Sequence, residues 1–360
     1  MAVPMIRAST FADLVSGRKR GIGAALLRCM LRISEVPYGL AVRWRNRRFD
    51  RGKREIHQVE RPVISVGNLT VGGTGKTPLV AHLARWFRDE DVRVTLISRG
   101  YGAEYGAMND EALELERRLP DVPHLQNPDR VEAARVAIDE LACQLILLDD
   151  GFQHRRIYRD LDIVLIDATA PFGYGHLLPR GLLREPLSGL NRADVVILSR
   201  ADMVAPDRRA EIRQRVERYA PDVPWVELAH RPQSLVSAGG VERPCDELAG
   251  KRVLAFSGIG NPTGFAHSLE TCRYEVVDTR SFPDHHAYDR EDVDSLIQWT
   301  GDHSDIDAIV CTAKDMVKIG VDQLGSLPLH ALTIGVEILR GGEALDDLVE
   351  PLLTKARAAG

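Results

Sequence analysis

A glycine-rich turn between an apolar strand and a helix constrains this chain of 360 residues more than any other feature. The segment VISVGNLTVGGTGKTPLVAHLARW begins as a buried strand, and Lys76 opens the helical stretch that follows. Three glycines let the backbone curl so that successive N–H groups point at phosphate oxygens. The segment therefore predicts a phosphate-binding loop. Its expected nucleotide-binding residues are Thr70, Val71, Gly72, Gly73, Thr74, Gly75, Lys76 and Thr77.

The loop departs from the pattern G-x-x-x-x-G-K-[ST] at one position, because Thr70 stands where the first glycine is usual. The physical roles at the other end of the loop are intact. Lys76 supplies a positive charge to the β- and γ-phosphates, the Thr77 hydroxyl ligates Mg²⁺, and the helix N-terminus adds its dipole. The alternative is a glycine-rich turn with a chance Lys-Thr pair, which the flanking strand and helix disfavour.

A phosphate-binding loop that uses Mg²⁺ needs an acidic side chain at the end of a neighbouring strand. Asp149 and Asp150 end the apolar run of LILLDDG, and Asp167 in LIDA is the competing candidate. Two adjacent carboxylates at a strand end are costly unless a cation neutralises them, which favours the pair over a solvated turn. The expected Mg²⁺ ligands are Thr77, Asp149 and Asp150.

Short runs rich in Val, Ile and Leu alternate with helical stretches from about residue 62 onward. Runs without polar alternation are typical of strands buried on both faces of a parallel sheet. The expected fold class is α/β, a P-loop NTPase-type doubly wound parallel sheet with a second, smaller α/β domain and a basic N-terminal helix. The predicted domains are a basic helical segment at 1–58, a P-loop core at 59–230 and a smaller domain at 231–360.

The charge of the chain is unevenly distributed. Residues 1–54 hold thirteen Lys or Arg and three acids, a balance of +10 in a chain whose net charge is −5. A basic arm on an acidic body indicates an anionic partner, and an amphipathic interfacial helix near residues 22–33 is one option. No run is long and apolar enough to predict a transmembrane span. The five cysteines include no C-x-x-C pair, which disfavours disulfides and structural zinc.

Several polar segments narrow the chemistry further. SRGYG follows a strand, the acidic NDE comes soon after it, and DGFQHRR continues directly from the acidic strand end. In the second domain, FPDHHAY places Asp284, His285 and His286 together. An Asp–His arrangement is what a kinase needs in order to remove a proton from an attacking hydroxyl. A loop of solvated polar residues is the alternative reading of this last segment.

Taken in order, GNLTVGGTGKTP, SRGYG, NDE, DDGFQHRR, LLPRGLLREP, FPDHH and TAKDMVK give the chain a close resemblance to the tetraacyldisaccharide 4′-kinases, the lipid A kinases of Gram-negative bacteria. The resemblance extends from the basic N-terminal helix to about residue 320. The phosphate loop of that family also lacks the first glycine, so Thr70 agrees with it.

The resemblance implies ATP and Mg²⁺ as cofactors and assigns roles to particular positions. It implies that Asp110 of the NDE segment acts with His285 to activate a sugar hydroxyl, although Asn109 stands where the family has glycine. The implied catalytic residues are Asp110, His285 and Lys76. The residues expected near the acceptor are Arg99, Tyr101, Glu111 and Gln153.

The reaction implied is ATP-dependent transfer of the γ-phosphoryl group to the 4′-hydroxyl of a tetraacyldisaccharide 1-phosphate, giving lipid IVA in lipid A biosynthesis. The basic helix would make a peripheral contact with the anionic surface of the inner membrane on its cytoplasmic face. No nucleic-acid partner is expected, because the arm lacks the aromatic residues of a single-strand platform. Since Asp110 and His285 fall in different predicted domains, catalysis is expected to require domain closure.

Two other protein classes share parts of these patterns. A P-loop ATPase switch or metallochaperone would carry an additional lysine where Val71 stands. A GTP-binding switch would read guanine with N-K-x-D, and both SRAD (199–202) and TAKD (312–315) resemble that pattern but lack its asparagine. A panel of nucleotides would separate the classes, since a guanine-reading site would prefer GTP sharply.

Overall fold

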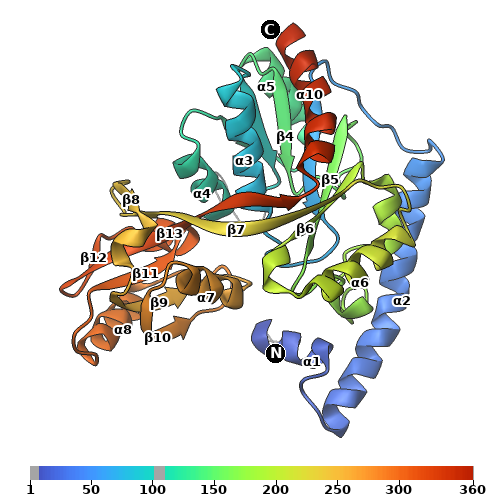
Figure 1. Cartoon of the computed structure of the whole chain (residues 1–360). Helices are drawn as coiled ribbons and strands as arrows, with labels where there is room; N and C mark the ends of the chain where they lie inside the picture. Colours follow the sequence, from blue (N-terminus) through green and yellow to red (C-terminus); the bar gives the residue numbers. More distant parts are fainter. Residues whose placement is uncertain (1–7, 101–109, 360) are drawn as a thin grey trace. The chain divides into compact units, whose positions relative to one another are not determined.

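The computed structural model describes residues 8–100 and 110–359 (Figure 1). These residues form two compact units, and the chain passes between them more than once. Unit 1 contains the described residues of 1–101, 119–229 and 337–360, and unit 2 contains those of 102–118 and 230–336.

The two units differ from the predicted domains at three places. The described residues of 102–118 belong to unit 2, those of 337–360 return to unit 1, and those of the basic segment 1–58 are part of unit 1. Long-range contacts account for the last two differences. Lys355 Nζ lies 2.5 Å from Asp160 Oδ1, and Tyr38 donates a hydrogen bond of 2.8 Å to the Arg184 carbonyl.

The strands of unit 1 form a parallel sheet in the order β7-β6-β5-β1-β4-β2-β3. The central strand β1 lies between β4 and β5, so the strand order reverses at its carboxyl end, which is where doubly wound sheets bind ligands. The strands are β1 (Val63–Asn68), β2 (Val94–Ser98), β3 (His124–Gln126), β4 (Leu145–Asp149), β5 (Leu161–Asp167), β6 (Val195–Ser199) and the first part of β7 (Trp225–Val236).

Burial on both faces explains why the apolar runs form this sheet. Every residue of β1, β2, β4, β5 and β6 is buried, which confirms the prediction of strands buried on both faces. The helices of unit 1 are α1 (Ala8–Ser16), α2 (Ile22–Asp50), α3 (Lys76–Asp89), α5 (Arg130–Asp139), α6 (Pro206–Glu217) and α10 (Gly342–Ala358).

The predicted basic N-terminal helix is present as α2, a helix of 29 residues. Only Gly39, Val42 and Phe49 of this helix are buried. Large apolar side chains are exposed along most of its length: Ile22, Leu26, Met30, Ile33, Val36, Leu40 and Trp44. Among the described helices, none combines the length and apolar content that a bilayer crossing requires.

Unit 2 is a smaller α/β unit, as predicted, with a parallel sheet in the order β10-β9-β11-β13. Two buried clusters of apolar side chains form its core, one containing Phe265 and the other Trp299. Its elements are α4 (Asp110–Arg118), β8 (Glu242–Pro244), β9 (Arg252–Ser257), α7 (Pro262–Thr271), β10 (Glu275–Ser281), α8 (Arg290–Gly301), β11 (Ala308–Thr312), α9 (Ala313–Ile319), β12 (Gln323–Leu324) and most of β13 (Leu327–Arg340).

Candidate active site

The predicted phosphate-binding loop joins β1 to α3 in unit 1. β1 ends at Asn68, and α3 begins at Lys76 with Thr77 in its first turn. Gly72 and Gly75 have φ angles of 108° and 83°, in the left-handed region where a side chain would strain the backbone. The loop therefore needs glycine at both positions, and it leads into the positive end of a 14-residue helix.

Asn68, the last residue of β1, holds the loop from within. Its side-chain amide donates to the Thr70 carbonyl at 2.9 Å and to Thr74 Oγ1 at 3.0 Å. Its amide oxygen accepts from Lys76 Nζ at 3.3 Å and from Arg184. Asn68 is fully buried, so a single side chain links the loop backbone to Lys76.

The SRAD segment at the end of β6 supports the loop from the neighbouring strand. Ser199 Oγ donates to the Thr74 carbonyl at 2.7 Å, and Arg200 Nη1 donates to the Gly73 carbonyl at 3.1 Å. The same Arg200 nitrogen donates to the carboxylate of Asp167. This pairing supplies Asp167, the competing metal candidate, with a positively charged partner.

We expect the substitution Ser199→Ala to weaken nucleotide binding. It leaves the buried Thr74 carbonyl without its 2.7 Å hydrogen bond, which costs about 1–3 kcal/mol and should raise the KM for ATP about 3- to 10-fold. Steady-state kinetics with varied ATP measure the effect, and thermal denaturation reports the loss of stability. The matched control is Ser257→Ala, since Ser257 is also buried at the end of a strand. An unchanged KM for ATP would contradict the supporting role.

The acidic pair lies where the sequence predicts it, at the end of β4. Asp149 is the last residue of that strand and is buried, and Asp150 follows with a left-handed φ of 56°. The carboxylate of Asp150 accepts two hydrogen bonds from Arg184, at 2.7 and 2.8 Å, and lies 3.3 Å from Lys76 Nζ. Asp150 therefore has two positively charged partners, Lys76 and Arg184.

The charge of Asp150 follows from this geometry. Burial by itself raises the pKa of the carboxyl, but the positive charge of Lys76 and the hydrogen bonds from Arg184 lower it by more. The pKa of Asp150 therefore lies well below its usual range, and the group is ionised at neutral pH. An ionised Asp150 holds the ammonium of Lys76 beside the loop.

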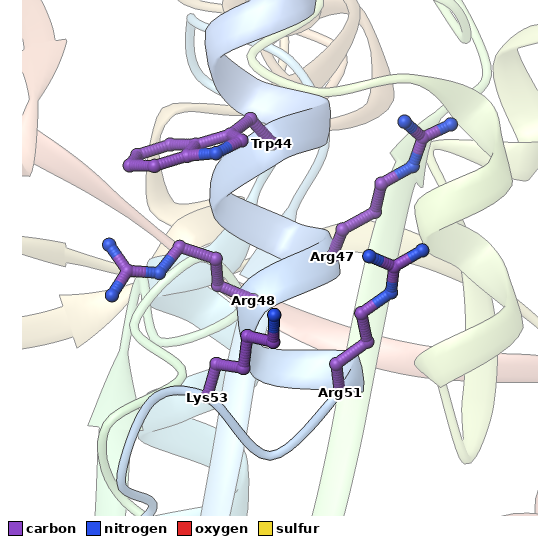
Figure 2. Close-up of a pocket in the computed structure, with 5 residues that line it drawn as sticks. All are labelled: Trp44, Arg47, Arg48, Arg51 and Lys53. Atoms are coloured by element: carbon purple, nitrogen blue, oxygen red, sulfur yellow. The ribbon is translucent and has the colours of Figure 1, made fainter.

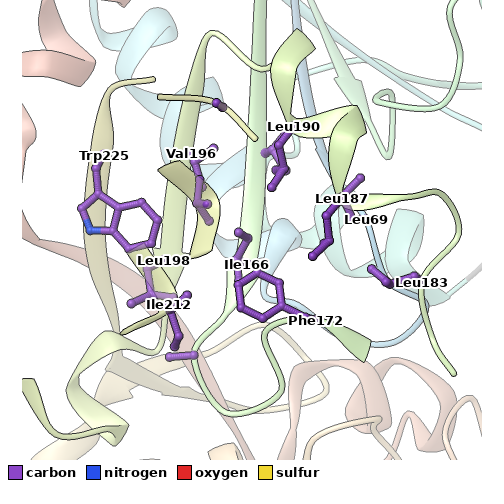
Figure 3. Close-up of a cluster of buried hydrophobic side chains, with 14 of the residues drawn as sticks. Leu69, Ile166, Phe172, Leu183, Leu187, Leu190, Val196, Leu198, Ile212 and Trp225 are labelled. Atoms are coloured by element: carbon purple, nitrogen blue, oxygen red, sulfur yellow. The ribbon is translucent and has the colours of Figure 1, made fainter. Parts of the chain in front are cut away.

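Arg184 comes from the LLPRGLLREP segment, and the fold explains how it is placed (Figure 3). Leu183 and Leu187 on either side of it are buried in one apolar cluster. The Arg184 N–H donates to the Leu69 carbonyl at 2.7 Å, and the Val71 N–H donates to the Leu182 carbonyl at 2.8 Å. The segment is thus attached to the phosphate loop by its backbone, which aims the guanidinium at Asp150.

Gln153 lies at the base of the phosphate loop. Its amide donates to the Asn68 carbonyl at 2.8 Å and to Glu185 Oε1 at 2.9 Å. Glu185 is fully buried and also accepts from Asn46 and from Arg192. The contacts of Gln153 therefore link the end of β1 to a buried carboxylate.

A second group of charged residues lies in unit 2, at the start of α4. His285 Nδ1 lies 2.8 Å from Asp110 Oδ2 and 3.0 Å from Oδ1, and Lys318 Nζ lies 3.0 Å from Oδ2. His285 has a left-handed φ of 59° in the loop after β10, and Lys318 lies in α9. The predicted Asp–His pair is thus in direct contact, with a lysine as its third member.

The two members of this pair shift each other's pKa. Burial raises the pKa of Asp110, but hydrogen bonds from His285 and Lys318 and the charges of both lower it by more, well below its usual range. The hydrogen bond to Asp110 raises the pKa of His285 above that of an ordinary histidine, against a smaller opposing effect of burial. Asp110 is therefore ionised at neutral pH and lies between His285 and Lys318.

A neighbouring ion pair fixes the start of α4. Glu111 Oε1 lies 2.8 Å from Lys314 Nζ, and Lys314 and Lys318 are one helical turn apart on α9. Asp110 and His285 both belong to unit 2. The expectation that two domains must close to bring this pair together is therefore wrong, because residues 102–118 are an insertion of unit 2 within the sequence of the P-loop core.

The remaining predicted residues lie as follows. Arg99 is exposed, directly after β2, and Tyr101 and Asn109 lie outside the described residues. Asp315 of TAKD is fully buried and accepts from the Gly258 N–H at 3.0 Å and from the Tyr288 hydroxyl at 2.9 Å. The Thr312 hydroxyl donates to the other carboxylate oxygen at 2.6 Å, so both oxygens of Asp315 have partners within unit 2 and neither is directed at a guanine base.

The sequence analysis did not identify four charged residues that lie near the acidic pair at the end of β4 or near the Asp110–His285 pair. Arg184 and Lys318 bind the acidic groups directly, and Lys314 binds Glu111. Buried Arg130, at the start of α5, is the fourth. Burial lowers the pKa of Arg130 while the charges of Asp150 and Asp149 raise it. The signal available for the two lysines was their spacing of four residues on a predicted helix, which suits the adjacent acids of NDE.

A phosphate-binding loop with its lysine and strand-end acids, together with an Asp–His pair able to accept a proton, defines a P-loop kinase. The sequence profile of the tetraacyldisaccharide-1-P 4′-kinases matches residues 27–353. The chain therefore belongs to the tetraacyldisaccharide 4′-kinase family and is an enzyme. The ATPase switch and metallochaperone class is set aside.

Individual relatives agree with the profile. A tetraacyldisaccharide 4′-kinase of Anaeromyxobacter sp. (strain K) is 38% identical over 355 residues and covers 92% of each chain. One of Halothermothrix orenii is 37% identical over 361 residues, covering 92% of this chain and 94% of its own. A crystal structure of an apo form of LpxK from Aquifex aeolicus in complex with ATP superposes with a TM-score of 0.70 at 30% identity, covering 91% of this chain and 99% of that one.

Proposed function

We propose that this enzyme transfers the γ-phosphoryl group of ATP to the 4′-hydroxyl of a tetraacyldisaccharide 1-phosphate, giving lipid IVA in lipid A biosynthesis. The observation that carries the proposal is the contact of Asp110 with His285, since a nucleotide-binding switch has no use for a proton acceptor of this kind. Family membership over residues 27–353 identifies the acceptor class.

The nucleotide is assigned to unit 1. Backbone N–H groups of the loop 70–77 and the N-terminus of α3 would surround the phosphates, and Lys76 would place its charge on the β- and γ-phosphates. Asn68 and Asp150 hold the Lys76 ammonium in place before the nucleotide arrives. Little reorganisation is then needed at the moment of reaction, which is how preorganised charges lower a barrier.

The donor groups at the loop suit Mg²⁺. Thr77 offers a hydroxyl in the first turn of α3, and Asp149 offers a buried carboxylate at the end of β4. Within residues 8–100 and 110–359 no three His, Cys, Asp or Glu side chains form a metal cage, and Mg²⁺ usually takes one or two carboxylates plus phosphates and water. Bound there with ATP, Mg²⁺ would neutralise phosphate charge. Asp150, the third expected ligand, stays part of the proposed Mg²⁺ site and would also hold Lys76 and Arg184.

The acceptor hydroxyl is assigned to the Asp110–His285 pair. In the transfer, the hydroxyl oxygen forms a bond to the γ-phosphorus while the bond to the β-phosphate oxygen breaks, and ADP leaves. The hydroxyl proton passes to Asp110, whose hydrogen bond to His285 spreads the proton over the pair. Arg99, Tyr101, Glu111 and Gln153 are proposed to lie near the acceptor.

We expect kcat/KM to rise with pH through the pKa of His285. This pKa is raised, so the ring stays protonated to higher pH than an ordinary histidine and keeps Asp110 a weak base. Once the ring loses its proton, Asp110 accepts a proton more readily, and the rate should then level off. Initial rates between about pH 6 and 9 measure the profile.

The variant His285→Asn should lack this rising limb, because asparagine has no titrating group. His286→Asn is the control, since His286 Nε2 lies 2.7 Å from Asp292 Oδ2, whereas the described partners of Asp110 are His285 and Lys318. A wild-type profile that is flat over the same range, or an unchanged limb in His285→Asn, would contradict the proposed coupling.

We also propose that α2 makes peripheral contact with the inner membrane on its cytoplasmic face, where ATP is available. The exposed apolar side chains of α2 recur at helical spacing, and the segment containing them is strongly basic. A lipid acceptor with several acyl chains resides in such a membrane, so the contact would bring the enzyme to its substrate. No nucleic-acid partner is proposed.

The test of the proposed reaction is transfer of label from γ-labelled ATP to a tetraacyldisaccharide 1-phosphate in neutral detergent micelles with Mg²⁺. Labelled lipid that is lost in Asp110→Ala and in Lys76→Ala supports the reaction and both central roles. Hydrolysis of ATP without labelled lipid would remove the acceptor assignment and leave a P-loop nucleotidase.

A further inference from the structure

One face of α2 changes character along its length. The exposed apolar residues Ile22, Leu26, Met30, Ile33, Leu40 and Trp44 follow each other at three-, four- or seven-residue steps, which places them on one side of the helix. The next positions at the same spacing are Arg47, Arg48 and Arg51. The face is therefore apolar up to Trp44 and cationic beyond it.

The cationic end of this face is hollowed into a pocket of about 400 Å³, lined by Trp44, Arg47, Arg48, Arg51 and Lys53. Figure 2 shows Trp44 and Arg48 projecting to one side of the helix and Arg47 and Arg51 to the other, with the Lys53 ammonium between them. The guanidinium of Arg48 lies over the Trp44 ring, 4.9 Å from its centroid. None of these five residues belongs to the phosphate loop.

The four positive charges of this pocket are not balanced by the protein. In the part of the chain that the structure describes, no acidic side chain forms an ion pair with Arg47, Arg48, Arg51 or Lys53. Asp50, the acid within the same stretch, is paired with Arg155 at 2.7 Å. Like charges held close together repel one another, so the cluster favours an anion in the pocket.

The end of a helix accounts for only part of this cluster. Cations in the last turn interact favourably with the helix dipole, which is a structural reason for Arg47 and Arg48. Arg51 and Lys53 lie beyond the last helical residue, Asp50. Helix stability therefore does not explain why these two residues add their charges to the same pocket.

We propose that this pocket binds the phosphate of an anionic membrane phospholipid. The inference rests on the proposed membrane contact of α2 and adds a defined headgroup site to it. Arginine forks bind phosphate oxygens in pairs, and tryptophan is enriched at the boundary between the apolar and headgroup layers of a membrane. The order apolar stripe, Trp44, then cations matches the order of layers in an anionic bilayer surface, so the bound phosphate marks the edge of the bilayer at Trp44.

The test compares binding of the full chain to phosphatidylcholine vesicles with and without about one-third phosphatidylglycerol. The wild type should prefer the anionic vesicles. The fourfold variant Arg47→Gln, Arg48→Gln, Arg51→Gln, Lys53→Gln should lose about 10³-fold in partitioning to them, at about 1 kcal/mol for each charge removed. Its binding to pure phosphatidylcholine should stay unchanged, because the apolar stripe is intact.

A matched variant removes four exposed charges elsewhere: Arg135→Gln, Arg218→Gln, Arg273→Gln and Arg290→Gln. It should keep the preference for anionic vesicles nearly intact. A fourfold variant that binds them like the wild type would overturn the site, and so would an equal loss in the matched variant, which would reduce the effect to net charge. Absence of any wild-type preference would overturn it as well.

Kinase assays in neutral detergent micelles separate this inference from the proposed reaction. The fourfold variant should phosphorylate the acceptor in micelles at the wild-type rate, since its residues touch neither the phosphate loop nor Asp110. If the wild type transfers no label in micelles, the proposed reaction fails while the vesicle result still decides the headgroup site. Circular dichroism melts of both variants confirm that folding is unchanged.

Discussion

The substitution Asp110→Asn is expected to lower kcat by about 10²- to 10⁴-fold, the usual contribution of a positioned general base. Asparagine keeps the shape of the side chain and an oxygen able to accept from Lys318, which lies 3.0 Å from the carboxylate, but it cannot take up the hydroxyl proton. The KM for ATP should stay within about twofold, because the nucleotide is assigned to unit 1. Steady-state kinetics with labelled ATP and the disaccharide in micelles measure both quantities.

The control for this prediction is Asp284→Asn. Asp284 belongs to the same FPDHH segment, and its carboxylate lies 3.9 Å from His285 Nε2, so it shares the neighbourhood of the base without touching Asp110. We expect its kcat to fall by no more than about threefold. Near-normal turnover in Asp110→Asn would refute the assignment of Asp110 as the proton acceptor, even if the protein proved to be a kinase.

Lys318 offers a second way to examine the same group. The Lys318 ammonium and His285 together lower the pKa of Asp110. Removing the lysine should therefore make the Asp110 carboxylate a stronger base, and it also removes one of the two contacts that position this side chain. In Lys318→Met the rising limb of the pH profile should move to higher pH, because the Asp110 carboxylate then has one positive charge fewer beside it and holds the proton of His285 more firmly. A change in kcat with an unaltered pH profile would instead indicate a purely structural lysine.

The strands and the phosphate loop of this protein could be predicted because their causes are local. Strands β1, β4, β5 and β6 are short runs rich in Val, Ile and Leu that are buried throughout, and helical stretches separate such runs along the chain, which favours a parallel sheet. The loop 70–77 carries its own geometry, since Gly72 and Gly75 adopt backbone conformations that favour glycine. The end of β4 then identifies Asp149 and Asp150 by position alone.

The partners of these residues could not be predicted, because they depend on contacts between distant parts of the chain. Arg184 reaches Asp150 only because Leu183 and Leu187 are buried in a cluster built largely from β5, β6 and their loops. Lys318 reaches Asp110 across about 200 positions of sequence. The local sequence around Arg184 and Lys318 does not predict which acidic residue each one contacts.

The division into units shows the same limit. The composition of the sequence indicates a boundary near residue 230. In contrast, α4 belongs to unit 2, although it lies within the sequence of the P-loop core, because it packs against α9. The position of α4 matters for the proposed function, because it places Asp110 in the same unit as His285. The Asp110–His285 pair is therefore assembled within one unit.

The substitution Lys76→Met is expected to lower kcat/KM for ATP by about 10²- to 10³-fold, the usual effect of removing one preorganised charge from a reacting phosphoryl group. Methionine has a similar length and no charge, so the change isolates the electrostatic contribution. The fold should survive, because Asp150 keeps its two hydrogen bonds to Arg184 at 2.7 and 2.8 Å after Lys76 is gone. Calorimetric titration with ATP and steady-state kinetics separate the loss in binding from the loss in turnover.

The matched control is Lys251→Met, which removes a lysine that is exposed in unit 2 and only loosely paired with Asp307 at 3.8 Å. It should leave kcat/KM unchanged within about twofold. If Lys76→Met binds ATP as tightly as the wild type but turns over slowly, Lys76 acts mainly on the charge that develops in transfer. If binding and turnover are both preserved, Lys76 does not serve the phosphates, and the phosphate loop owes its affinity to backbone N–H groups and the α3 dipole.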